Sequence, residues 1–152
     1  MAERCRSETI SLTADIIVLA TAGGQWHVLL IQRGHEPFAG RWALPGGYVD
    51  PGETSADAAI RELREETNVV VPKAFRQVGA YDEPGRDPRG RVVSVAYLAV
   101  LTQRPTATAG DDAAAAQWVP VEQVVTDLAE LAFDHGQILS DALDLAGLGP
   151  AF

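Results

Sequence analysis

Three closely spaced glutamates, Glu62, Glu65 and Glu66, form the strongest candidate metal site in the sequence. Residues 54–67 have helical periodicity, and an advance of about 100° per residue places the three carboxylates on one arc beside an apolar stripe. The members of that stripe are Ala56, Ala59, Ile60, Leu63 and Thr67. Like charges at this spacing repel one another, and a bound divalent cation would remove that cost. Carboxylate oxygens at this density suit Mg²⁺ or Mn²⁺.

The same glutamates are also compatible with an ordinary solvated helix face. Arg61 and Arg64 would then offset their charge, and Arg61 can pair with Glu65 four residues later. An isolated E-x-x-E-E pattern favours this solvated face, because surface helices are commonly this charged. The preceding loop, taken together with the helix, favours the metal site instead.

The loop and the helix together match a long pattern of fixed spacing. Residues 46–70 are GGYVDPGETSADAAIRELREETNVV. From residue 47 to residue 69 this segment resembles the Nudix box, G-x5-E-x7-R-E-U-x-E-E-x-G-U, in which U is an aliphatic residue. The matching residues are Gly47, Glu53, Arg61, Glu62, Leu63, Glu65, Glu66 and Val69. Asn68 replaces the second glycine of the pattern, and asparagine can also adopt a positive φ.

This resemblance implies a fold, an activity and a set of site residues. Nudix proteins share an α/β/α sandwich around a central mixed sheet, and most hydrolyse a nucleoside diphosphate linked to another group. The family pattern implies that Glu53 pairs with Arg61 and fixes the loop against the helix. The metal ligands that it implies are Glu62, Glu66, the supporting Glu65 and the backbone carbonyl of Gly46.

Segments outside the box resemble the bacterial and archaeal ADP-ribose pyrophosphatases. These segments are FAGRWALPGGYVDPGE, YDEPGRDPRGRVVSVAYLAV, GDDAAAAQWVPV and LAFDHGQIL. The resemblance implies Mg²⁺-dependent hydrolysis of ADP-ribose to AMP and ribose 5-phosphate. The same segments occur in NrtR-type repressors, which carry a winged-helix domain after the Nudix half. Because the chain stops at Phe152, we expect no such DNA-binding domain.

Two alternatives to ADP-ribose hydrolysis remain open. MutT-like members of the family hydrolyse ordinary or damaged nucleoside triphosphates with the same metal site. A sensor would instead bind ADP-ribose or another NAD metabolite without cleaving it. The intact glutamate pattern argues against the sensor, because sensors can lose these carboxylates.

Four arginines and a tryptophan are candidates for contact with the substrate. Arg86 and Arg89 lie in the loop EPGRDPRGR, where they would bind phosphate or ribose, or pair with acids of the same loop. Arg41 precedes the LPGG turn and could reach a phosphate. Trp42 could stack on a ring of the substrate or pack in the core. Arg33 closes a predicted strand and faces either the cleft or the solvent.

A further carboxylate is expected to orient or deprotonate the attacking water. The candidates are Glu65, Glu83, Asp111 and Asp112. Asp111 and Asp112 lie in a loop before the last predicted strand, and many Nudix enzymes take a base from that side of the site. All four carboxylates remain candidates for the residue that activates the water.

Composition and length limit the class of protein. The 152 residues, with a formal net charge of −9, fit a single domain spanning 1–152 and disfavour nucleic-acid and anionic-membrane partners. Cys5 is the sole cysteine, and the polar N-terminus lacks the apolar core of a signal peptide, so we expect a cytoplasmic protein. A homodimer is compatible with this size, but no interface stripe stands out.

Hydrophobic patterns and turn residues predict a mixed α/β chain. The predicted strands are residues 10–21, 26–32, 69–71, 75–81, 92–101 and 115–119, of which the first two form a hairpin. The predicted helices are residues 54–67, 120–131 and 135–148. The first of these helices starts at Thr54 or Ser55 and ends at Asn68. Residues 38–52 are rich in glycine and proline and are expected to be mostly loop.

Overall fold

The computed structural model describes residues 7–110 and 112–149, in which seven strands form one mixed sheet. Five strands lie in the order β3-β2-β1-β6-β5, β4 pairs with β1, and β7 pairs with β2. The strands are β1 (Ser11–Ala22), β2 (Gln25–Arg33), β3 (Trp42–Ala43), β4 (Gly46–Tyr48), β5 (Arg76–Tyr81), β6 (Val92–Leu101) and β7 (Ala113–Pro120). β1 and β6 are parallel, and the other pairs are antiparallel.

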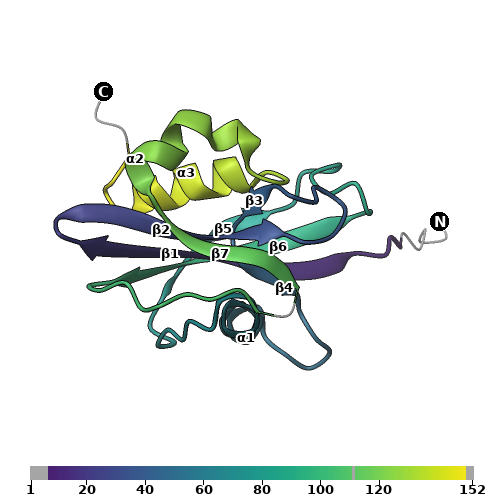
Figure 1. Ribbon diagram of the computed structural model, residues 1–152. Helices are drawn as coiled ribbons and strands as arrows, with labels where there is room; N and C mark the ends of the chain where they lie inside the picture. Colours follow the sequence, from purple (N-terminus) through teal and green to yellow (C-terminus); the bar gives the residue numbers. More distant parts are fainter. Residues whose placement is uncertain (1–6, 111, 150–152) are drawn as a thin grey trace.

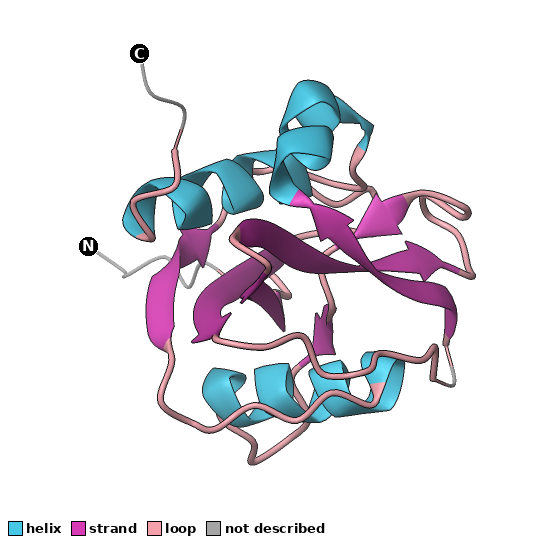
Figure 2. Cartoon of the chain, turned by 60° about the vertical axis from the view of Figure 1, so that its left-hand side comes forward, coloured by secondary structure: helices cyan, strands magenta, loops and turns pink. Residues whose placement is uncertain are grey.

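Helices cover both faces of this sheet. The helices are α1 (Ser55–Thr67), α2 (Val121–Val124), the 3₁₀ helix η1 (Val125–Glu130) and α3 (His135–Leu145). In Figure 1, α1 lies below the sheet, whereas α2 and α3 lie above it. Figure 2 shows the same three layers from the side, with the helices at the top and bottom of the molecule. The α/β/α architecture expected from the family resemblance is therefore confirmed.

The alternation of side chains along β1 supplies both hydrophobic cores. Ile17 and Leu19 pack in the core toward α3, while Ile16 and Val18 pack in the core toward α1. All four side chains are fully buried. Successive residues of a strand point to opposite faces, so a strand with helices on both sides needs an uninterrupted apolar run.

The helix predicted after residues 46–54, here called the box loop, forms with the expected ends. The Thr54 side chain accepts a hydrogen bond from the Asp57 backbone N–H, and Asn68 ends α1 in the left-handed conformation with φ 60°. The apolar stripe is displaced relative to the prediction: Ala58 is fully buried, whereas Ala56 and Ile60 of the predicted stripe are only half-buried. The remaining members of the buried face are Ala59, Leu63 and Thr67.

Three other predicted elements differ from the structure. Residues 69–71 form no strand, and the expected loop 38–52 contains the short strands β3 and β4. The helix predicted over 120–131 divides into α2 and η1, with Asp127 outside helical geometry at φ −148°. Among the described residues, the helices all lack the length and apolar character needed to span a bilayer.

Candidate active site

Glu62 and Glu66 line one cavity of about 390 Å³ where α1 meets β4. Both come from α1, and the pairing of β4 with β1 brings Gly46 and Gly47 beside them. The other residues of the lining come from β1, β2, the loop after β2, the box loop, the loop after β5 and the turn before β7. They are Thr13, Ile31, Arg33, Gly34, His35, Glu36, Tyr48, Asp50, Arg89 and Asp112.

Glu66 is the most deeply placed carboxylate of this cavity. Its Oε1 accepts a hydrogen bond of 2.8 Å from the Gly46 backbone N–H. Burial, together with the negative charge of Glu62, raises the pKa of Glu66 to about 8. A carboxylate in such surroundings gains from a nearby positive charge, because desolvation penalises its ionised form.

Glu62 lies against the backbone of the box loop. Burial raises the pKa of its carboxyl, while the Arg61 guanidinium opposes that shift. A Cβ on Gly47 would lie 2.6 Å from the Glu62 carboxyl carbon, and a Cβ on Gly46 would collide with the Ala14 carbonyl oxygen. Both glycines are thus required by close approach, which is the physical reason for Gly47 at the start of the box and for Gly46 just before it.

Arg61 ties the box loop to α1. It donates two hydrogen bonds to Glu53, of 2.8 and 2.9 Å, and a third of 3.0 Å to the Tyr48 carbonyl oxygen. These hydrogen bonds lower the pKa of Glu53 to about 2 and raise that of Arg61. Arg61 also bonds Glu62 and Glu65, so a single guanidinium holds carboxylates from both the loop and the helix.

The carboxylates of Glu62 and Glu66 fit a Mg²⁺ ion that receives only part of its ligands from the protein. Among the described residues, no three histidine, cysteine, aspartate or glutamate side chains converge into a ready-made cage. Mg²⁺ usually binds through one or two carboxylates and completes its shell with water and substrate phosphates. Two carboxylates in an open cavity next to the Gly46 backbone meet that requirement.

Arg33 and Arg89 supply positive charge to the same cavity. Arg33 donates through Nε to the Pro37 carbonyl oxygen at 2.7 Å, and Arg89 pairs with Asp87 at 2.7 Å. The Arg89 guanidinium also lies 5.1 Å from the centre of the Tyr48 ring. Guanidinium groups and carboxylates therefore line one cavity, an arrangement suited to binding a phosphate together with a divalent cation.

A small polar cavity of about 50 Å³ adjoins the main one and shares Glu66, Arg33 and Arg89 with it. Asp15 and His135 line its inner end, with both side chains buried. Neither residue is among the site residues expected from the sequence: Asp15 stands alone in the apolar β1, and a lone histidine such as His135 is more often a cap or packing residue than a base.

Apart from Glu53, Arg61 and Arg86, three predicted site residues lie outside the lining of the cavity. Glu65 is about half exposed and bonds Arg61. Trp42 packs against the core toward α3 and lines a different hollow between β2, β7 and η1. Arg41 is exposed, with its guanidinium 5.6 Å from the centre of the Phe38 ring.

The Arg86 side chain is buried and pairs with Asp134. Its side chain is 4% exposed and donates two hydrogen bonds to Asp134, of 2.9 and 2.5 Å. It borders the small polar cavity. A phosphate would have to compete with Asp134 for this guanidinium, whereas Arg33 lines the main cavity without a carboxylate bonded to it among the described residues.

The four candidates for the water-activating carboxylate occupy different places. Asp112 lines the main cavity, and its Oδ1 lies 3.9 Å from His35 Nε2. His35 also lines this cavity but belongs to no recognisable motif in the sequence. Glu83 is exposed in the loop after β5. Asp111 lies outside the described residues. Asp112 is therefore the candidate from the last predicted loop that faces the cavity.

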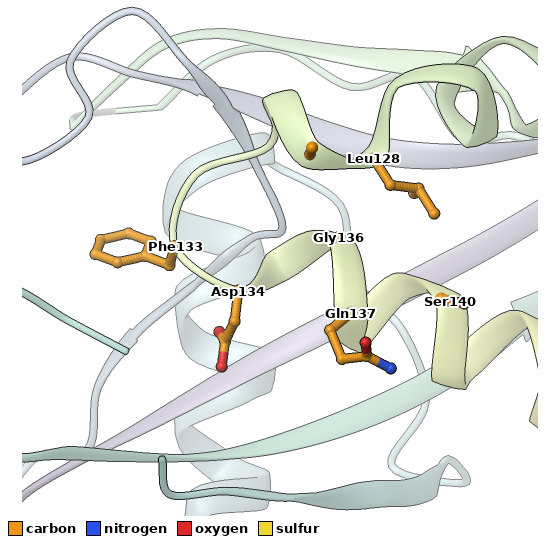
Figure 3. A pocket seen from close by; sticks show the side chains of 7 residues that line it. Leu128, Phe133, Asp134, Gly136, Gln137 and Ser140 are labelled. Carbon is orange, nitrogen blue, oxygen red and sulfur yellow. The ribbon is translucent and has the colours of Figure 1, made fainter. Parts of the chain in front are cut away.

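A separate hollow of about 240 Å³ lies between η1 and α3 (Figure 3). It is lined by Leu128, Ala129, Phe133, Asp134, Gly136, Gln137 and Ser140. It contains a single carboxylate, and that carboxylate is already bonded to Arg86. Neither a metal site nor a phosphate site is indicated there.

Comparisons with known proteins agree with this geometry. A model of the NUDIX domain matches residues 10–142. An ADP-ribose pyrophosphatase of Methanocaldococcus jannaschii is 42% identical over 114 residues, which cover 75% of this chain and 64% of that protein. The chain spans 64% and 52% of the lengths of two curated relatives.

Two solved structures share the fold and contain relevant ligands. The NUDIX domain of Shewanella oneidensis NrtR, complexed with ADP ribose, has a TM-score of 0.84 at 31% identity, covering 92% of this chain and 90% of that one. A bifunctional NMN adenylyltransferase/ADP ribose pyrophosphatase of Francisella tularensis, complexed with AMP and a Mn ion, has a TM-score of 0.82 at 33% identity. That match covers 94% of this chain and 44% of the other.

Proposed function

Because its residues 10–142 match the NUDIX domain, this chain belongs to the Nudix family, and we propose that it hydrolyses ADP-ribose to AMP and ribose 5-phosphate with Mg²⁺. One observation carries the proposal: Glu62 and Glu66 share a cavity with Arg33 and Arg89. The volume of about 390 Å³ lies in the range of small-molecule sites. The named pyrophosphatase from M. jannaschii and the ADP ribose in the NrtR domain support this substrate.

Glu62, Glu66 and the carbonyl of Gly46 would hold the metal, with Glu65 as an outer member. When bound, a divalent metal supplies positive charge that offsets the charge of the phosphates. Mn²⁺ would serve in place of Mg²⁺, since both take hard oxygen ligands. Arg61 and Glu53 keep the loop and helix that carry these ligands in a fixed relation.

The remaining lining residues bind the substrate and direct the water. Arg33 and Arg89 offer guanidinium forks to the phosphates, with Arg86 behind them. Asp112 would accept a hydrogen bond from the attacking water and take up its proton as the water oxygen bonds to one phosphorus. The bridging phosphorus–oxygen bond breaks, and the two phosphates leave as AMP and ribose 5-phosphate. Arg41 and Trp42, which lie outside the lining of the cavity, would contact the ribose or the base of the bound nucleotide.

Glu66→Gln tests the metal site. We expect the variant to fold and to lose at least roughly 100-fold in Mg²⁺-dependent turnover, the scale of loss when a metal site is disturbed. Glu65→Gln should lose less, because the Glu65 side chain lies outside the cavity lining. Glu130→Gln, which changes an exposed glutamate far along the chain, serves as control. Wild-type rates for Glu66→Gln under saturating Mg²⁺ would refute the assignment.

A panel of nucleotide substrates tests whether ADP-ribose is preferred over nucleoside triphosphates. ADP-ribose should turn over at least roughly tenfold faster than any nucleoside triphosphate, a discrimination of about 1.4 kcal/mol. A faster rate with a nucleoside triphosphate would select the MutT-like alternative, which needs the same carboxylates.

A sensor is the second candidate, because the NrtR domain was crystallised with ADP ribose. A calorimetric titration with ADP-ribose, followed by product analysis after several hours, separates the two. Binding without released AMP would favour the sensor.

We also propose a cytoplasmic setting, a small nucleotide as the partner, and neither nucleic acid nor membrane as a ligand. The net charge of −9 supports the last two points. Light scattering would show whether the chain is a homodimer.

A further inference from the structure

Phe133 occupies an unusual backbone position in the turn before α3. Its φ is 54°, and that of Phe38, whose ring it contacts, is 62°. The two ring centroids are 4.8 Å apart in an edge-to-face arrangement. A bulky residue at positive φ is strained and persists only where its surroundings stabilise it. The contacts of the Phe133 ring indicate why this residue keeps a positive φ.

Two arginines lie over the Phe133 ring. The guanidinium carbon of Arg33 is 4.9 Å from the ring centroid, and that of Arg89 is 5.4 Å from it. Both arginines line the cavity that contains Glu62 and Glu66. One aromatic ring is thus shared by the two cationic groups on the substrate side of the site.

Two guanidinium groups held close together repel each other. Burial, and after it the positive charge of Arg89, lower the pKa of Arg33. The negative face of an aromatic ring attracts cations and partly offsets such repulsion. A leucine in the same place would fill the volume but would present no such face.

Hydrogen bonds from the Ala132 backbone and the His135 side chain, on either side of Phe133, connect this turn to residues 42–44 just before Gly46. The Ala132 N–H donates to the Trp42 carbonyl oxygen at 2.9 Å, and His135 Nδ1 accepts from the Leu44 N–H at 3.0 Å. Asp134 holds Arg86 with two hydrogen bonds. The ring and the Asp134 carboxylate leave this turn in different directions (Figure 3). The ring therefore has a fixed position relative to Leu44, two residues before Gly46.

We propose that Phe133 is a positioning residue that presents Arg33 and Arg89 to the phosphates of a nucleoside diphosphate substrate. This inference rests on the proposed function for the role of the two arginines. It adds a residue outside the box whose contribution is to substrate binding and not to metal binding.

The test compares Phe133→Leu with Phe133→Tyr. Phe133→Leu removes the aromatic face, whereas Phe133→Tyr keeps it. Phe75→Leu is the matched control, because Phe75 is also a half-buried phenylalanine in an edge-to-face pair, with Tyr97. Phe133 lines the small polar cavity next to the main one, whereas Phe75 lines neither of the two. For each variant, kcat and KM with ADP-ribose are measured, together with the Kd of ADP by calorimetry at fixed Mg²⁺ and the Mg²⁺ concentration for half activation.

Phe133→Leu is expected to raise both KM and the Kd of ADP about tenfold, equivalent to about 1.4 kcal/mol. Its kcat and Mg²⁺ requirement should change less than about twofold, because Glu66 and Glu62 keep their hydrogen bonds to the Gly46 N–H and to Arg61. Phe133→Tyr should stay within about twofold of the wild type in all four quantities. A merely structural role for Phe133 would not divide KM from kcat in this way.

An unchanged Kd of ADP in Phe133→Leu, or an equal loss in Phe75→Leu, would overturn the proposal. An equal loss in Phe133→Tyr would do the same, since the aromatic face would then be irrelevant. If Phe133→Leu does not fold, Phe133→Met replaces it with the same expected values. Because the Kd of ADP needs no turnover, it still decides the role of Phe133 if no variant, including the wild type, hydrolyses ADP-ribose.

Discussion

Glu65 and Glu66 are neighbours in sequence but differ in their surroundings. One residue along a helix turns the side chain by about 100°, which takes Glu66 into the cavity and leaves Glu65 about half exposed beside Arg61. Burial raises the pKa of Glu66 to about 8. Two identical side chains thus have different chemistry because only one is removed from water.

Gly47→Ala tests the close approach of the box loop to Glu62. The new methyl group would displace the Glu62 carboxylate, which is the end of a flexible side chain, so the variant should fold. We expect Mg²⁺ affinity to fall by roughly 10- to 100-fold, as when the orientation of a metal ligand is lost. Gly79→Ala is the control, because nothing lies within 3.7 Å of a Cβ there. Calorimetric titration with Mg²⁺ measures both, and equal affinities would contradict the role of Gly47.

At the scale of elements, the site depends on how α1 joins the loop before it. Glu53 and Arg61 are eight residues apart and meet through two hydrogen bonds. The pKa of Glu53, lowered to about 2, means that the folded state favours the ionised carboxylate. Its contribution to stability is therefore complete above the unfolded pKa, near about 4.5, and is lost as the pH falls toward about 2.

Glu53→Gln should consequently be less stable than the wild type at neutral pH. The difference should shrink as the pH is lowered from about 5 toward about 2, because the wild-type carboxylate becomes protonated in that range. Urea unfolding at several pH values measures this, with Glu130→Gln, a change at an exposed glutamate, as control. A difference that stays constant with pH would mean that the Glu53–Arg61 pair does not act through charge.

The exit of α1 is set by Asn68, at φ 60°. Its side chain donates to the carbonyl oxygen and the hydroxyl of Thr108, which ties the loop before β7 to the helix end. Asn68→Ala should cost about 1–2 kcal/mol, because alanine is strained at positive φ and makes neither hydrogen bond. Asn68→Gly should cost less, since glycine relieves the strain. Urea denaturation ranks the variants, and equal losses would show that φ is not the cause.

At the scale of the whole molecule, two hydrophobic cores share one sheet. Leu139 on α3 and Leu63 on α1 are both fully buried, on opposite faces. Because β1 contributes alternate side chains to both cores, loss of one core should destabilise the other.

Leu139→Ala should therefore lower the free energy of unfolding by about 2–5 kcal/mol through the cavity it leaves, and unfolding should remain a single transition. Val125→Ala, at a position 40% exposed, should change the free energy by no more than about 0.5 kcal/mol. Circular dichroism and tryptophan fluorescence should report the same midpoint in urea. Two separate midpoints would show that the α3 layer unfolds independently.

The net charge of the protein does not describe the charge around the cavity. The net charge of −9 disfavours polyanionic partners, but part of the acidic excess lines the cavity at Glu62 and Glu66. Arg33 and Arg89 lie on the other side of the same space. A bound cation would reverse the sign around the carboxylates, so a negatively charged protein can still have a site for an anionic nucleotide.

The sequence by itself determined the elements that rest on local patterns. Helix α1 with its Thr54 cap and Asn68 exit, the hairpin of β1 and β2, and the spacing of the box follow from periodicity and turn chemistry over fewer than about 20 residues. The short strands β3 and β4 were not predicted, because they form only by pairing with β2 and β1.

Only the tertiary structure decided which polar side chains share one space. Arg33 and Arg89 are far apart in the chain, yet both lie over Phe133. Arg86 and Arg89 belong to one loop but have different acidic partners, Asp134 and Asp87. Burial and charge pairing depend on contacts between distant segments, and local sequence carries little information about those contacts. The box therefore indicates the carboxylates that we propose as metal ligands, while the fold selects the groups that we propose to face the substrate.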